Sequence, residues 1–310
     1  MHPWMAQIHP GFRTGLIAWL IARAGILTML YSKGALAPSE LDPAGAPLWG
    51  ALVITTQVIG SWAGWAMLAA GEIAMLVAIL SVYHFCRRDT LPQTADRAAW
   101  LAALSPIAAA LIPVNAWTFA APACLCALAA AVNARHILAL GCITLAISLR
   151  PELVLLAPGV AMLGWRSRQP GKTPEWAPWM LALGPVAILT LTIFASFGLA
   201  GMGGISMRTL HVEEWRQGIV WQGMEDVVFV LGIFVAVVCA AKFAGRTPKS
   251  WVFLTLPCLL WPLAHQHPGE FAPMALCAAP IFAYVAKIGE EPALERLTLA
   301  ISAMLLLIML

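Results

Sequence analysis

The sequence predicts an all-α integral membrane protein that crosses the bilayer many times. Hydrophobic residues make up 61% of the 310 residues and charged residues only 11%, and the mean hydropathy is +0.83. Soluble domains contain roughly 45–50% apolar and about 25% charged residues, so a water-soluble fold is excluded. Apolar runs with short polar breaks fill the whole chain. They leave room for about eleven transmembrane helices of roughly 20 residues.

The positions of Lys and Arg predict the orientation, because cytoplasmic loops retain positive charge. We place the N-terminus in the cytoplasm and the first span at residues 15–33. Two spans within the apolar stretch from Pro47 to Cys86 would put the next three arginines outside. We therefore interpret 34–60 as an outer loop with a short interfacial helix at Pro47–Ile59, and 62–86 as one span.

The rest of the chain is predicted to form hairpins of short helices within the same single transmembrane domain, residues 1–310. The spans expected there are 98–114, 116–133, 136–149, 151–165, 177–200, 227–243, 251–264, 270–286 and 297–310. An outer loop at 201–226 fits a second amphipathic helix on the interface, because charges alternate there with Trp215 and Trp221. The C-terminus is then outside.

This threading segregates the charges. Of the 18 Lys and Arg residues, all lie on the cytoplasmic side except Arg23, Lys33, Arg150, Arg208 and Arg216. No cluster of basic residues is interleaved with aromatic ones, so nucleic acid is excluded as a partner. The seven cysteines lie almost entirely in apolar runs, and we interpret them as small core residues.

Arg150 and Glu152 lie at the tip of a hydrophobic hairpin. Charged side chains at membrane depth are costly unless they are paired or face a watery cavity. One interpretation is that Arg150 binds the phosphate of a lipid-linked substrate, because a planar guanidinium suits phosphate. The other is that Arg150 and Glu152 pair with each other and cap two helix ends. The residues alone leave both open.

A second polar turn contains His265, His267 and Glu270. Two histidines and a glutamate are metal-ligand types, but Pro268 and Gly269 break any helix that would align them, so we assign no metal site. The open alternatives are a turn that faces a substrate and a plain solvated loop.

Three further acidic residues are candidates for a functional role. Glu40 and Asp42 follow the first span, where a carboxylate can act as general base on an acceptor hydroxyl or simply be solvated. Glu72 lies inside the 62–86 span, which marks either a buried hydrogen bond or a functional pocket.

Several weak motifs occur in a characteristic order. A carboxylate follows the first span (Asp42 or Glu40), and Gly45-Ala46-Pro47 opens the interfacial helix. The outer turn Pro113-Val114-Asn115, the hairpin Leu149-Arg150-Pro151-Glu152 and the turn His267-Pro268-Gly269-Glu270 come next. This order resembles the GT-C superfamily of integral-membrane glycosyltransferases, especially bacterial relatives of GPI mannosyltransferase II. Departures are Asn115 in place of a frequent acid, a short first loop without Asp-x-Asp, and a C-terminal turn without its arginine and tyrosine.

The resemblance implies transfer of mannose or another hexose from a polyprenyl-phosphate-linked donor to an acceptor on the periplasmic side of a bacterial inner membrane. Asp42 or Glu40 would be the catalytic base. The residues that would bind substrate are Arg150, Glu152, Asn115, His265, His267 and Glu270. Some relatives use a divalent cation and others do not, so no cofactor is assigned.

The departures favour a different class as the alternative, a catalytically inactive GT-C-like scaffold or assembly subunit with a membrane protein as its partner. A small transporter ranks last, because no inverted repeat is evident.

Overall fold

The computed structural model is all-helical in the part of the chain that it describes. That part comprises residues 10–32, 47–105, 114–168, 171, 174–200, 230, 234, 237–238, 241, 248–263, 272–288, 296 and 298–304. The predicted loop at 201–226, most of the predicted span 227–243 and half of the predicted span 297–310 lie outside it. The prediction of an all-α fold is confirmed for the described residues.

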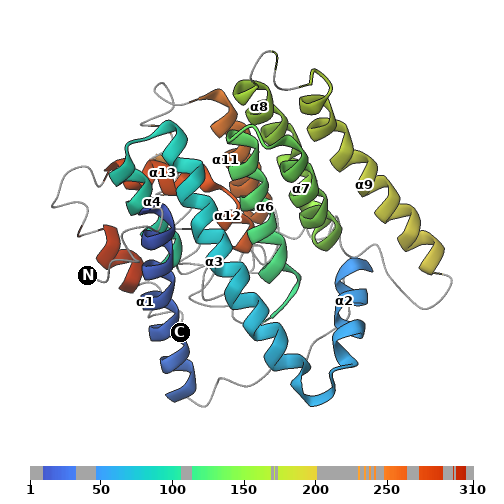
Figure 1. Ribbon diagram of the computed structural model, residues 1–310, viewed down its shortest axis with the longest axis horizontal. Helices are drawn as coiled ribbons and strands as arrows, with labels where there is room; N and C mark the ends of the chain where they lie inside the picture. Colours follow the sequence, from blue (N-terminus) through green and yellow to red (C-terminus); the bar gives the residue numbers. More distant parts are fainter. Residues whose placement is uncertain are drawn as a thin grey trace.

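The helices follow one another in the order shown in Figure 1. They are α1 (Pro10–Ser32), α2 (Pro47–Gln57), the 3-10 turn η2 (Gly60–Trp62), α3 (Ala63–Asp89), α4 (Pro92–Ala103), α6 (Ala116–Val132), α7 (His136–Leu149), the 3-10 helix η3 (Pro151–Leu156), α8 (Ala157–Ser167), α9 (Ala177–Ala200), α11 (Lys249–Leu263), α12 (Ala272–Leu276) and α13 (Ala279–Ile288).

The apolar stretch before Arg87 is divided as the charge pattern predicted. α2 ends at Gln57, Gly60 takes a φ of +68°, and α3 then continues to Asp89. Glycine adopts positive φ at no steric cost, so the chain turns sharply at this position. A separate short helix before a single long one is therefore confirmed. Its location at an outer interface remains a prediction.

Prolines set the helix ends that differ from the sequence prediction. The expected span 98–114 is instead α4, which begins at Pro92 and ends at Ala103, just before Pro106. Proline suits the first helical position and disfavours helix in the residue before it. The expected span 270–286 is divided into α12 and α13, because Pro280 has no N–H with which to continue a helix from α12.

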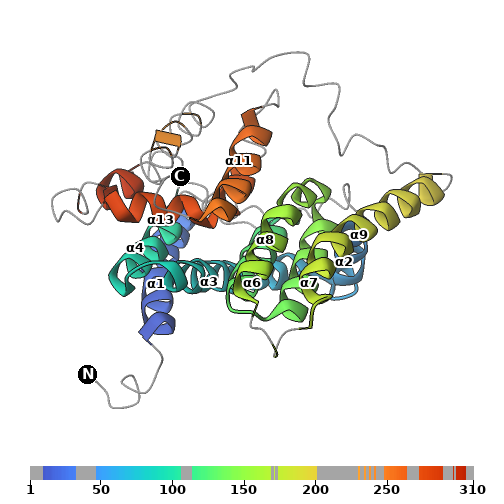
Figure 2. The same cartoon turned by 90° about the horizontal axis from the view of Figure 1, so that it is seen from above.

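α6 is the central helix of the described bundle. Fifteen of its 17 residues are buried, most of them alanine, and it packs against α3, α7, α8 and α12. Small side chains allow helices to approach closely. Seen from above, α1, α4 and α13 lie on one flank of α3 and α6, and α2, α7, α8 and α9 on the other (Figure 2).

Ser167 and Arg150 lie at opposite ends of α6. The last turns of α3, α6 and α8 meet at one end, where the Ser167 hydroxyl donates to the Ala131 carbonyl over 2.5 Å. At the other end, Trp117 in the first turn of α6 lies beside Arg150, which follows α7. At 1.5 Å per residue these two ends are about 25 Å apart. We call them the Ser167 end and the Arg150 end.

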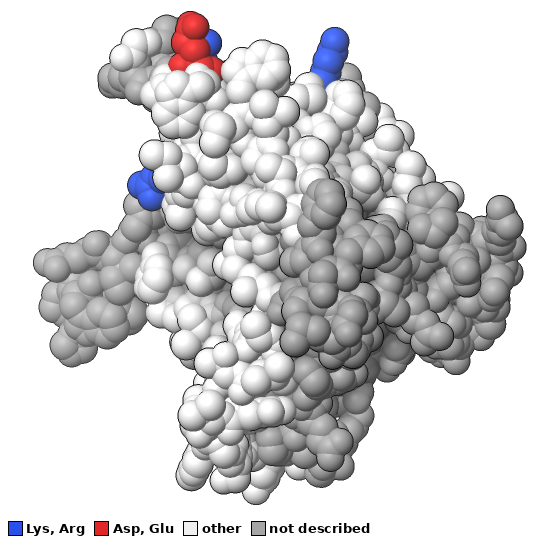
Figure 3. Space-filling model, turned by 90° about the vertical axis from the view of Figure 1, so that its right-hand side faces the viewer, with Lys and Arg blue, Asp and Glu red and all other residues white. Residues whose placement is uncertain are grey.

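The surface of the described residues is suited to a bilayer. Among them, Gly11–Ser32 and Gly60–Asp89 are long and apolar enough to cross a membrane, and several shorter apolar helices accompany these two. Along α9, Trp179, Leu183, Val186 and Leu191 are all exposed. The described part of that face is almost free of charge, and its few charged groups lie mainly toward its upper edge (Figure 3). Apolar exposure on this scale marks a membrane or partner surface.

Candidate functional site

Arg150 is held between an aromatic ring and a carboxylate. Its guanidinium carbon Cζ lies 4.3 Å from the centroid of the Trp117 ring. Its Nη2 donates to Glu152 Oε1 over 3.1 Å. The Arg150 side chain is 25% exposed and that of Glu152 only 2%. The cation is therefore fixed from two sides and still accessible to a ligand.

The backbone around Arg150 explains its position. Pro151 disfavours helix in the residue before it, and Arg150 accordingly takes an extended conformation with φ −142° and ψ 97°. Its N–H donates to the Ala146 carbonyl as α7 ends, and its carbonyl accepts from the Leu153 N–H as η3 begins. The Arg150 backbone is therefore hydrogen-bonded both to α7 and to η3.

Asn115 fixes the tryptophan under the cation. The Asn115 Oδ1 accepts from the Trp117 N–H over 2.9 Å, while the Asn115 N–H donates to the Thr118 hydroxyl oxygen over 3.1 Å. This reciprocal capping box begins α6 and orients its first turn. Asn115 was predicted to bind substrate. The structure gives it a helix-capping role, and contact with substrate remains a prediction.

In the Arg150–Glu152 ion pair, only one of the two Glu152 carboxylate oxygens is hydrogen-bonded to a described residue. Glu152 Oε2 is buried and has no hydrogen-bond partner within the described part of the chain. A buried carboxylate needs a partner charge, because removal from water penalises the ionised form. Both interpretations of the hairpin tip therefore remain: the predicted Arg150–Glu152 pair exists, and the guanidinium is also open to a ligand.

Glu72 forms a second buried ion pair, with Arg23 of α1. Arg23 Nε donates to Glu72 Oε2 over 2.7 Å, and Nη2 donates to Oε1 over 2.5 Å. The side chains are 4% and 12% exposed. The question that the sequence left open at Glu72 is thus answered by a buried hydrogen-bonded pair. The sequence contained a signal for this pair, because Arg23 and Glu72 are isolated, oppositely charged residues in the predicted spans 15–33 and 62–86.

The other predicted site residues lie outside the described part of the structure. They are Glu40, Asp42, His265, His267 and Glu270. Whether they converge on Arg150 stays a prediction. Among the described residues, no group of three or more His, Cys, Asp or Glu side chains is placed to hold a metal ion.

Comparison with known proteins identifies the fold. No protein-family model matches the chain, and no curated protein matches its sequence. The arrangement of its described helices is similar to that of a solved membrane enzyme. Two crystal structures of the Archaeoglobus fulgidus oligosaccharyltransferase match it, one tethered through a disulfide to an acceptor peptide with the NVT sequon and one in the apo form.

Both matches have a TM-score of 0.51 and 13% sequence identity. They cover 86% and 84% of this chain but only 46% and 44% of the oligosaccharyltransferase chains. The chain therefore spans less than half the length of those proteins. The likeness concerns the fold alone, and it confirms the predicted all-α, GT-C-like fold class.

Proposed function

We propose that the protein is a membrane glycosyltransferase. It transfers mannose or another hexose from a polyprenyl-phosphate-linked donor to an acceptor on the non-cytoplasmic face of a bacterial inner membrane. The observation that carries the proposal is an accessible arginine, Arg150, stacked on Trp117 at one end of an apolar GT-C bundle. The motif order that resembles bacterial relatives of GPI mannosyltransferase II supports the choice of sugar.

The chemistry requires a cation where the leaving group develops charge. The acceptor oxygen bonds to the anomeric carbon as the bond from that carbon to the phosphate oxygen breaks, and the electron pair leaves with the polyprenyl phosphate. A fixed guanidinium stabilises this charge without reorganising. The acceptor proton goes to a carboxylate, for which Asp42 or Glu40 is the proposed base.

The proposed pocket also includes the polar turn near the C-terminus. His265, His267 and Glu270 would line it beside Arg150 and Glu152. Arg150 is the single residue between the end of α7 and the start of η3. This short hairpin tip would allow a lipid-linked phosphate to approach Arg150 from the leaflet.

A scaffold or assembly subunit without catalytic activity is the second candidate. The observation that favours it is that Glu152 already compensates Arg150, while Asn115, where the family often has an acid, caps α6. Such a subunit would use the apolar surface to bind another membrane protein.

Transfer of radiolabelled hexose from a polyprenyl-phosphate donor in membranes tests the proposal. The wild type should incorporate label, and Arg150→Ala and Asp42→Asn should each lower incorporation by about 100-fold, the usual loss when a group that stabilises the transition state is removed. Equal incorporation by all three proteins would exclude both residues from the site.

A matched variant separates chemistry from folding. Arg150→Ala leaves the buried Glu152 carboxylate without its partner, so that variant is expected to unfold more easily. The double variant Arg150→Gln/Glu152→Gln removes both charges together. Normal thermal unfolding with no transfer would assign the loss to the missing charged pair and not to unfolding, whereas full transfer would contradict the phosphate contact. Arg135→Gln, an exposed change at the Ser167 end, is the control that should transfer normally.

A further inference from the structure

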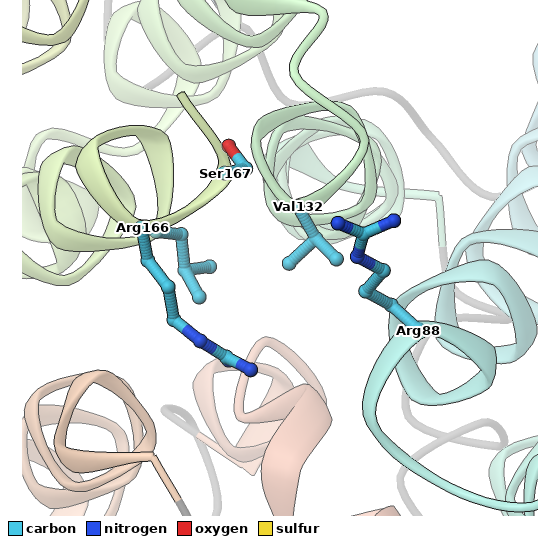
Figure 4. A pocket seen from close by; sticks show the side chains of 5 residues that line it. Arg88, Val132, Arg166 and Ser167 are labelled. Atoms are coloured by element: carbon cyan, nitrogen blue, oxygen red, sulfur yellow. The ribbon is translucent and has the colours of Figure 1, made fainter. Parts of the chain in front are cut away.

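A small cavity lies at the Ser167 end, at the opposite end of the bundle from Arg150. Its volume is about 140 Å³, and it is lined by Arg88, Val132, Leu163, Arg166 and Ser167. Three helices, α3, α6 and α8, contribute these residues from their C-terminal ends. In Figure 4 the Arg88 guanidinium lies beside Val132, and Arg166 extends from α8 on the other side of the same opening.

The two arginines differ in how they are held. Arg166 Nη1 and Nη2 donate to the two Asp89 carboxylate oxygens over 2.7 and 2.5 Å. This hydrogen-bonded carboxylate raises the pKa of Arg166, so the guanidinium stays charged. Arg88 is exposed and makes no hydrogen bond or ion pair with another described residue. The cavity therefore has two cations, Arg166 and Arg88, and of these only Arg166 is bound to the Asp89 carboxylate.

These arginines are not needed to cap the helices around them. Basic side chains in a last turn often compensate free carbonyls. Here, however, the Ala129 carbonyl accepts from the Asn133 amide, and the Ala131 carbonyl accepts from the Ser167 hydroxyl. In α3 the Cys86 carbonyl accepts from both the N–H and the hydroxyl of Thr90. These three carbonyls are satisfied without an arginine, and the Arg88 donors are not used on them.

The size and charge of the cavity define the class of ligand. Water occupies about 30 Å³ per molecule, so the cavity has room for about four or five water-sized groups, which is the scale of one phosphate. Guanidinium groups match phosphate through paired N–H donors. The cavity also opens at the end of α3, which is long enough to span a bilayer. Basic pockets between membrane helices bind lipid headgroups.

We propose that this cavity binds a phosphate group through Arg88 and Arg166. The phosphate is either part of an anionic lipid headgroup or a soluble phosphate. The site is separate from the proposed transferase site, which lies at the other end of α6, so neither proposal depends on the other.

Two binding measurements on the purified full-length chain test the site. In the first, native mass spectrometry compares retention of phosphatidylglycerol and phosphatidylcholine. In the second, thermal unfolding is followed in inorganic phosphate and in chloride at equal ionic strength. Arg88→Gln should reduce phosphate-dependent retention or stabilisation by roughly tenfold, since a hydrogen bond to a charged group is lost. Val132→Phe should do the same by filling the cavity while both arginines remain.

Arg135→Gln is the matched control, because Arg135 is exposed at the same end but does not line the cavity. Preference for phosphatidylglycerol alone identifies a lipid as the ligand, and stabilisation by inorganic phosphate alone identifies a soluble phosphate. Both results support the site if Arg88→Gln and Val132→Phe abolish them and Arg135→Gln does not. The proposal is overturned if neither phosphate source is preferred, if Arg135→Gln reduces binding equally, or if both cavity variants bind normally.

Discussion

At the scale of single residues, Arg23 and Glu72 show how this chain places charge inside apolar helices. Both side chains are almost wholly buried, and two hydrogen bonds join them across α1 and α3. Burial of two ions costs about as much as their attraction returns, so such a pair adds little net stability. Its contribution is geometric, because any other register of α1 on α3 would separate the two side chains and break both hydrogen bonds.

This interpretation predicts strong coupling between the two positions. Glu72→Leu should lower the free energy of unfolding by about 3–5 kcal/mol, because it removes the carboxylate that accepts two hydrogen bonds from the buried Arg23 guanidinium. The double variant Arg23→Met/Glu72→Leu should recover most of this loss. Denaturant titration of the purified chain in detergent measures both. Additive losses in the double variant would show that the two side chains do not depend on each other.

At the scale of helices, close packing depends on small side chains at the contacts. A Cβ at Gly159 of α8 would come within 2.5 Å of Leu254 Cδ2 and 2.8 Å of its Cγ in α11. The Cγ atom is not the flexible end of the side chain, so Leu254 cannot easily move away. The glycine therefore permits the approach of α8 to α11.

Gly159→Ala should destabilise the protein by about 1–3 kcal/mol, as overpacking of a core does. Gly141→Ala is the matched control, because Gly141 also lies in a helix and an added Cβ there meets nothing within 4 Å. That control should be neutral or stabilising by about 0.5–1 kcal/mol, since alanine favours helix over glycine. Thermal unfolding in detergent distinguishes the two, and equal effects would contradict the described α8–α11 contact.

At the scale of the whole molecule, the helix directions place the two candidate sites on opposite sides of an apolar body. α3, α6 and α8 all end near Ser167, and α7 ends at Arg150. The threading predicts that Arg88, Arg135 and Arg166 face the cytoplasm, and the structure places all three away from Arg150. Which side is cytoplasmic is a prediction from the charge pattern.

Cysteine labelling tests that orientation. Arg135→Cys at the Ser167 end and Trp62→Cys near the start of α3 are both at exposed positions. A membrane-impermeant maleimide should label Trp62→Cys in intact spheroplasts and Arg135→Cys only in inverted vesicles. The unmodified chain measures the background from its native thiols. Labelling of both positions from one side would contradict a membrane-spanning α3, and the reverse pattern would contradict the predicted orientation.

Much of the element order was predictable because apolar length and proline placement act locally. The hairpin expected at 116–133 and 136–149 corresponds to α6 and α7 almost to the residue, since Asn115 and Pro151 mark its boundaries. The expected span 98–114 was wrong in its limits. There the apolar composition continues past Ala103, and the helix does not.

The sequence by itself determined that this is an apolar, all-α chain with segregated charge, because hydropathy and charge placement are properties of local segments. It also indicated Arg150 as a candidate phosphate ligand. Only the tertiary structure decided that Arg150 rests on Trp117, that Glu72 is bonded to Arg23, and that Arg88 and Arg166 share a cavity. Those partners are far apart in sequence, and the packing of helices around α6 alone brings them together.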